Sequence, residues 1–187
     1  MEKIINYFNK IGIPETELNP FLTKLNSKTF RTGDILLSPG QTDDYLSFLH
    51  SGIIRYFVQT DTKESTFDFV LPNNFYCHYD SFHTRNPTMF SSQALVDCEI
   101  SRIHNNDLIE LFSTCKYAKD LTKSAVEKLL EKKVKRELSL LTDTPEQRYL
   151  KLFEKKPELI QLIPQKYLAT YLGIVPETLS RIRKRIS

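Results

Sequence analysis

The sequence predicts an α+β fold in which an antiparallel β jelly roll is followed by a long helix and a small all-helical domain. Three observations support this prediction. Between about residues 29 and 104, short β-branched and aromatic runs alternate with turn residues at intervals of about 8–12 positions, which is typical of a sandwich or jelly roll. Residues 117–141 contain neither Gly nor Pro. Beyond residue 145, apolar residues recur at three- and four-residue spacing.

The elements follow in order along the chain. Ile4, Ile5 and Phe8 share one face of a short N-terminal helix, which Gly12-Ile13-Pro14 separates from the next. About six to eight short strands come next. They end at Asn105-Asn106-Asp107, where good N-cap residues introduce a helix. The expected parts are a jelly roll at 1–115, a long helix at 116–142 and a helical domain at 143–187.

The long helix carries two apolar faces. One face is formed by Ala118, Leu121, Ala125 and Leu129. The opposite face is formed by Val126, Leu130, Val134, Leu138 and Leu141. A helix with two apolar faces needs two partners, so we expect one face on the chain's own jelly roll and the other on the same helix of a second chain, as a homodimer. A solvated helix within a monomer is the alternative.

The charge is distributed unevenly. Residues 1–104 hold 9 basic and 12 acidic side chains, whereas residues 105–187 hold 17 basic and 11 acidic ones, which favours a polyanionic partner for the second part. The sequence has no transmembrane or signal-peptide pattern, and three widely spaced cysteines do not indicate a disulfide framework. We therefore expect a cytoplasmic protein without a membrane partner. We expect no enzyme, because the sequence contains no phosphate loop, nucleophile elbow or zinc-protease motif.

The C-terminal residues carry the pattern of a helix-turn-helix. Such a motif needs a small residue where its helices cross and a residue that tolerates positive φ in the turn, and Ala169 and Gly173 have these properties. Apolar residues must bury the second helix, and these are Ile174, Leu179, Ile182 and Ile186. The side chains that point the other way, onto the face that enters the major groove, are those of Glu177, Ser180, Arg181 and Lys184. Arg183 and Arg185 flank this face and can reach backbone phosphates. The predicted DNA-binding residues are Glu177, Thr178, Ser180, Arg181, Arg183, Lys184 and Arg185.

With both halves in view, the chain resembles the CRP/FNR family of bacterial transcription regulators over nearly its whole length. The resemblance is strongest in Leu168-Ala169-x-x-Leu172-Gly173-Ile174-x-x-Glu177-Thr178-Leu179-Ser180-Arg181-Ile182. Glu177 and Arg181 match positions that contact bases in the family, whereas Pro176 stands where many members have Arg. Glu146-Gln147-Arg148-Tyr149 resembles a short branch common in Bacteroidetes. The resemblance implies a cyclic-nucleotide-binding-like jelly roll and a homodimer that binds double-stranded DNA; a small-molecule effector and RNA polymerase are further partners that it allows.

The resemblance predicts the fold of the jelly roll but not that it binds the family's ligand. In the family, a Gly-Glu pair contacts the ribose and an Arg-Ser pair contacts the cyclic phosphate. At the matching places this chain has residues 74–79 and Thr88-Met89, so it lacks both the Glu and the Arg. A buried phosphate would lack a cationic partner, so we expect that cyclic AMP does not bind. The predicted effector-pocket residues are Phe67, Phe69, Phe75, Tyr76, Cys77, His78, Tyr79, Thr88 and Met89. They either fill the core or hold an apolar effector.

Two further alternatives concern the kind of protein. Cys77-His78 and His83 could bind a metal or haem, as a nearby Cys and His do in carbon-monoxide-sensing relatives, but they do not form a closed zinc set. We therefore expect no cofactor and no metal. The second alternative is a ligand-sensing or protein-docking module with the same jelly roll and no specific DNA target.

Overall fold

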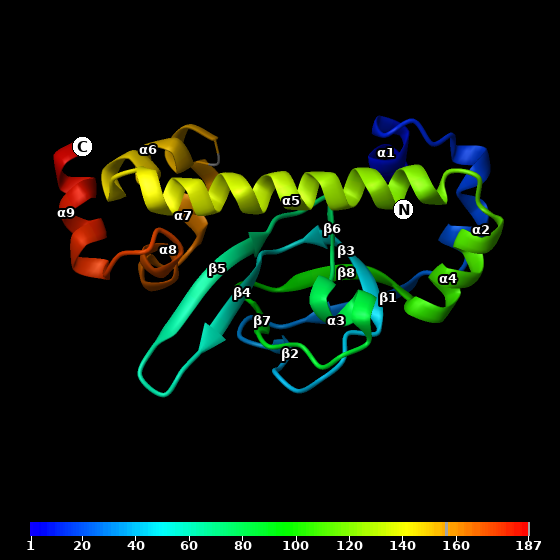
Figure 1. The fold of residues 1–187 in the computed structure, drawn as a ribbon, viewed down its shortest axis with the longest axis horizontal. Coiled ribbons are helices and arrows are strands. Elements are labelled where there is room, and N and C mark those ends of the chain that lie inside the picture. The colour runs from blue at the N-terminus through cyan, green and yellow to red at the C-terminus, as the bar shows by residue number, and fades with distance from the viewer. Residues whose placement is uncertain (156, 187) are drawn as a thin grey trace. The chain divides into compact units, whose positions relative to one another are not determined.

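Two four-stranded sheets form the predicted antiparallel jelly roll (Figure 1). The computed structural model describes residues 1–155 and 157–186. The strands are β1 (Asn26–Phe30), β2 (Ile35–Leu37), β3 (Tyr45–Ser51), β4 (Ile54–Gln59), β5 (Glu64–Val70), β6 (Asn74–Tyr76), β7 (Ser91–Ala94) and β8 (Cys98–His104). One sheet has the order β1-β8-β3-β6 and the other β2-β7-β4-β5. The pairings β1–β8, β3–β8, β3–β6, β2–β7 and β4–β7 are antiparallel.

Helices precede the sheets, interrupt them once and make up the C-terminal part of the chain. They are α1 (Glu2–Lys10), the 3-10 turn η1 (Glu15–Glu17), α2 (Asn19–Leu22), α3 (Tyr79–Thr84), α4 (Asn105–Thr114), α5 (Ala118–Thr142), α6 (Pro145–Lys155), α7 (Pro157–Leu162), α8 (Gln165–Tyr171) and α9 (Pro176–Ile186).

Large apolar side chains fill much of the core of the jelly roll. Phe48 and Leu49 of β3 are fully buried, as is Ile103 of the neighbouring β8. The turn after β3 requires glycine, because Gly52 has φ +100° and a Cβ there would lie 2.5 Å from the Cys98 sulfur. The turn after β3 therefore lies close against the start of β8.

The chain is divided into two compact units. The first consists of residues 1–58 and 68–120, and the second of residues 59–67 and 121–187. The tip of the β4–β5 hairpin therefore belongs to the same unit as most of α5 and the C-terminal helices. The boundaries at residues 115 and 142 stay predictions.

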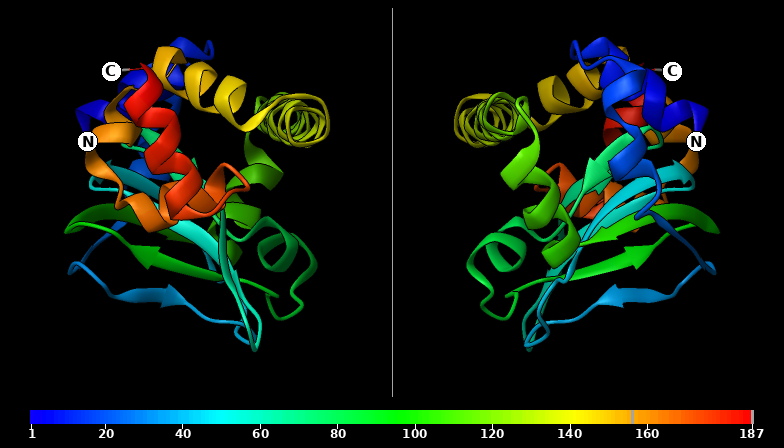
Figure 2. Two further views of the ribbon diagram at one scale, coloured as in Figure 1. Left: turned by 90° about the vertical axis from the view of Figure 1, so that its left-hand side faces the viewer. Right: turned by 90° about the vertical axis from the view of Figure 1, so that its right-hand side faces the viewer.

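Helix α5 is a single straight helix, seen end-on in Figure 2. Its sequence explains this shape, since kinks arise mostly at Pro, Gly or helix bulges. Within one chain the predicted outer face is open to solvent: the exposed fractions are 62% for Leu130, 46% for Val134, 54% for Leu138 and 77% for Leu141. On the other predicted face Leu129 is half-buried and Ala125 is exposed, while the side chains of Ala118 and Leu121 lie outside the described residues.

Candidate DNA-binding and effector sites

Helices α8 and α9 pack together as the helix-turn-helix pattern predicts. Leu168 and Ala169 of α8 are buried, as are Leu179 and Ile182 of α9. The chain turns between the two helices at Gly173, whose φ of +72° favours glycine. Pro176 is the first residue of α9, where its missing N–H costs no helical hydrogen bond.

The exposed face of α9 is polar and mostly basic. Glu177, Arg181 and Lys184 are exposed, whereas Thr178 and Ser180 are half-buried. A carboxylate near the helix N-terminus is favourable, as are cations near its C-terminus. This face can therefore present hydrogen-bonding side chains to base edges in a groove of DNA.

Arg183 and Arg185 contact other helices of the same unit, and Ile186 departs from its prediction. Arg183 is half-buried: its Nη2 donates to the Ile160 carbonyl at 3.3 Å. Arg185 forms an ion pair with Glu146 at 3.2 Å. Ile186 was predicted to face the core but is 40% exposed, because α9 ends there over a surface cavity of about 360 Å³ lined by Tyr149, Phe153, Ile160, Arg183 and Ile186.

The pattern of α8 and α9 did not reveal a polar link between them. The side-chain amide of Gln165 donates to the Pro176 carbonyl at 2.9 Å. Gln165 thereby connects the first turn of α8 with the first turn of α9. Glutamine is common at exposed helical positions, so no sequence signal distinguished this residue.

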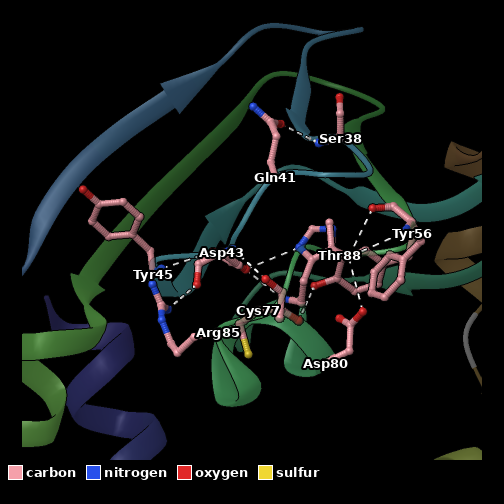
Figure 3. Close-up of polar contacts among 12 residues, drawn as sticks. Ser38, Gln41, Asp43, Tyr45, Tyr56, Cys77, Asp80, Arg85 and Thr88 are labelled. Atoms are coloured by element: carbon pink, nitrogen blue, oxygen red, sulfur yellow. Dashed lines mark hydrogen bonds and ion pairs between the residues drawn. The ribbon is translucent and has the colours of Figure 1, made fainter.

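In the first unit, His78 is the centre of the predicted effector region. It is 2% exposed, and its ring stacks on Phe90 with centroids 4.5 Å apart and meets the edge of Tyr56 at 5.0 Å. The Asp43 Oδ2 atom accepts the His78 backbone N–H at 2.8 Å and lies 3.3 Å from Nδ1. Figure 3 shows Asp43, Thr88 and Asp80 close together around the start of α3. Asp43 was missed in the sequence, because it precedes His78 by 35 residues.

Several buried polar atoms in this region have no hydrogen-bond partner within the described chain. They are His78 Nε2, Asp80 Oδ1 and Ser92 Oγ. Thr88 is buried, and its hydroxyl lies 3.5 Å from the Asp80 carboxylate. Asp43 and Asp80 add negative charge, while Arg85 is held by Asp44 and by the Asp43 carbonyl. The region therefore suits hydrogen-bond donors better than an anion.

The other predicted effector residues do not gather around His78. Phe75 packs with the aromatic rings of Tyr7, Phe8, Phe21 and Phe48, and Tyr79 stacks on His83 near the surface. Met89 is 79% exposed. Phe69 is buried and Tyr76 half-buried, whereas Phe67 belongs to the second unit, where the Lys133 ammonium lies 5.1 Å from its ring.

The cysteine and histidine residues of this region lie in different surroundings. Burial raises the pKa of the Cys77 thiol to about 12, and burial likewise raises the pKa of Tyr56, whose hydroxyl donates to the Cys77 carbonyl at 3.0 Å. His83 is exposed while His78 is buried. Among the described residues, no three His, Cys, Asp or Glu side chains converge on a point that could hold a metal ion.

Comparison with known proteins agrees with this architecture. Residues 27–115 match the family model of the cyclic nucleotide-binding domain. Over these residues the chain is similar to cyclic nucleotide-binding domains. No curated protein matches it by sequence. Within the described residues, no helix is long and apolar enough to cross a membrane.

Solved structures of CRP/FNR transcription regulators share the fold with little sequence identity. FixK2 from Bradyrhizobium japonicum has a TM-score of 0.76 and 15% identity, over 87% of this chain and 84% of that one. CLP, the c-di-GMP-responsive global regulator of Xanthomonas campestris, has a TM-score of 0.68 and 19% identity, over 91% and 90% of the chains. The Thermus thermophilus catabolite activator protein has a TM-score of 0.58 and 20% identity, over 94% and 84%. The predicted fold class, that of the CRP/FNR regulators, is confirmed.

Proposed function

We propose that the protein is a sequence-specific DNA-binding transcription regulator of the CRP/FNR type, acting in the cytoplasm as a homodimer and not as an enzyme. The observation that carries the proposal is α9, which is anchored by buried Leu179 and Ile182 and exposes Glu177, Arg181 and Lys184. An anchored helix with an exposed polar face is the geometry of a recognition helix. The similar structures from Xanthomonas campestris and Thermus thermophilus are a global regulator and a catabolite activator protein, which supports the same conclusion.

The exposed apolar face of α5 supports the homodimer. A row of large apolar side chains is seldom left open on a soluble monomer. The same helix of a second chain would present the same face, and a two-fold axis would bring the two faces together. A dimer with two recognition helices would bind a two-fold symmetric DNA site.

The surroundings of His78 support a jelly roll that does not bind cyclic AMP. Buried Thr88 stands where the family resemblance expects arginine, and Asp80 lies beside it. A cyclic phosphate there would be desolvated next to a carboxylate and would gain no cation. An effector, if this region takes one, would carry hydrogen-bond donors instead.

Replacing Arg181 with Ala tests the DNA-binding proposal. The variant should lose about 1–3 kcal/mol of affinity for a selected duplex and should relax the preference at one base position of each half-site. Fluorescence anisotropy at fixed salt measures both effects, because phosphate contacts make affinity salt-dependent. The matched control is Arg31→Ala, which removes an exposed arginine of the first unit and should leave binding unchanged.

Loss of affinity by the control as well, or no loss by Arg181→Ala, would contradict a role for α9 in base recognition. A wild-type protein that binds all duplexes equally at physiological salt would favour the alternative, a docking or ligand-sensing module without a specific DNA target.

A further inference from the structure

Two arginine side chains hold the end of the first helix of the helix-turn-helix. The last carbonyl groups of an α-helix have no partner within the helix. At the end of α8, the Tyr171 carbonyl accepts a hydrogen bond from Arg136 Nη2 at 2.5 Å, and the Leu172 carbonyl accepts one from Arg148 Nε at 2.8 Å. Arg136 lies on α5 and Arg148 on α6, so two other helices of the same unit meet at this turn.

Each arginine is fixed by a second contact. The Arg136 guanidinium lies 4.0 Å from the centroid of the Tyr171 ring, in cation–π geometry. Arg148 Nη1 donates to the Asp143 carbonyl at 2.5 Å, at the junction of α5 and α6. The planar guanidinium has five donors, so one arginine can join two backbone segments.

The junction that Arg148 holds is itself well connected. The Asp143 carboxylate accepts hydrogen bonds from Ser139 at 2.6 Å and from Lys151 at 2.8 Å, and these contacts lower its pKa. Thr144 and Gln147 form a reciprocal capping box at the start of α6, with distances of 2.8 and 3.2 Å. The end of α5 and the start of α6 therefore form one hydrogen-bonded block.

The turn after α8 lies directly against this block. A Cβ built on Gly173 would be 3.3 Å from Leu140 Cδ2 of α5 and 3.8 Å from Arg148 Nη2. Helix α9 begins three residues later, and Gln165 holds its first carbonyl. The direction of α9 thus depends on the contacts that α5 and α6 make with this turn.

We infer that Arg136 and Arg148 are positioning residues for DNA recognition, which fix the direction of α9 relative to α5. The inference rests on the proposed function. In a dimer joined along α5, this direction determines the separation of the two recognition helices, which must match half-sites about 34 Å apart. Without these hydrogen bonds, α9 populates several directions. Only the molecules in which α9 has the correct direction can bind both half-sites, so the affinity falls in proportion to their fraction.

The test compares three duplexes: a full operator obtained by selection, the same operator with two base pairs inserted between the half-sites, and a single half-site. Wild-type protein should bind the full operator far more tightly than the insertion duplex. Arg136→Gln should bind the full operator about tenfold more weakly, bind the half-site as the wild type does, and show a reduced difference between the full and the insertion duplexes. Arg136→Lys keeps a cation and a donor and should lie between the two.

Lys128→Gln is the matched control, because it removes an exposed cation of α5. It should change none of the three affinities. Circular dichroism during thermal unfolding checks that each variant is folded, and Arg148→Gln takes the place of Arg136→Gln if the latter does not fold.

The inference is overturned if Arg136→Gln keeps the wild-type ratio between the full and the insertion duplexes. It is also overturned if the variant loses the same factor on the half-site, since that would show a general loss of structure in α9. Failure of the wild type to prefer any sequence would instead overturn the proposed function, on which the inference depends.

Discussion

Replacing Leu130 and Leu138 together with Gln should dissociate the dimer. These side chains are 62% and 54% exposed in a single chain, and burying a leucine fully contributes about 1.5–3 kcal/mol. Covering the exposed half of four such side chains, two from each protomer, is then worth about 3–6 kcal/mol. Glutamine is a good helix former, so the variant should keep α5 helical while its dimer dissociation constant rises about 1,000-fold.

Sedimentation velocity over a range of protein concentrations measures this change. The control is Ile109→Gln on α4, which removes a side chain of similar exposure, 63%, that lies off α5. The control should sediment as the wild type. Equal dissociation constants for the double variant and the wild type would refute the assignment of the dimer interface to this face, and a monomeric wild type would refute the dimer itself.

Three more predictions follow from the two units. Calorimetric titration with cyclic AMP should show no saturable binding at micromolar concentrations, whereas micromolar saturation would contradict the argument from Thr88 and Asp80. Gly173→Ala should lower the free energy of unfolding by about 1–2 kcal/mol in urea denaturation because of its left-handed φ, and Gly173→Asn should cost less; equal costs would point to a steric cause. Burial raises the pKa of the Cys77 thiol to about 12, which leaves about 1,000-fold less thiolate at neutral pH than an ordinary cysteine has. Because the side chain is half-buried, Cys77 should react with a disulfide reagent more slowly in the folded than in the unfolded protein, and equal rates would contradict the raised pKa.

The sequence predicted those features that depend on residues of the same element. Alternation of side chains predicted about six to eight short strands, although β6 lies where the alternation was weak. Three- and four-residue spacing correctly placed Leu179 and Ile182 in the core, whereas Ile174 is half-buried. The same argument was less accurate for Ile186, which lines a surface cavity at the end of α9 and is 40% exposed. Arg183 was predicted to flank the outward face, and its side chain donates to the Ile160 carbonyl. Helical periodicity specifies a direction but does not show where the neighbouring element stops.

Contacts between distant segments could not be predicted in the same way. Asp43 meets His78 across 35 residues, and Arg136 meets the Tyr171 carbonyl across another 35. Neither pair forms a local motif. Every residue has a backbone carbonyl, so the residue type at position 171 does not show that its carbonyl accepts a hydrogen bond from Arg136. The predicted effector residues illustrate the same limit. Phe75 of β6 packs in an aromatic cluster with the N-terminal helices and not against His78.

Selection of binding sites from a random pool of DNA duplexes, followed by sequencing, tests the central proposal most directly. A dimer joined along α5, with one α9 in each protomer, should enrich an inverted repeat whose half-sites are centred about 34 Å, or one helical turn, apart. Enrichment of a single asymmetric motif would contradict the dimeric arrangement. Absence of any enriched sequence would contradict the assignment of the protein as a sequence-specific regulator.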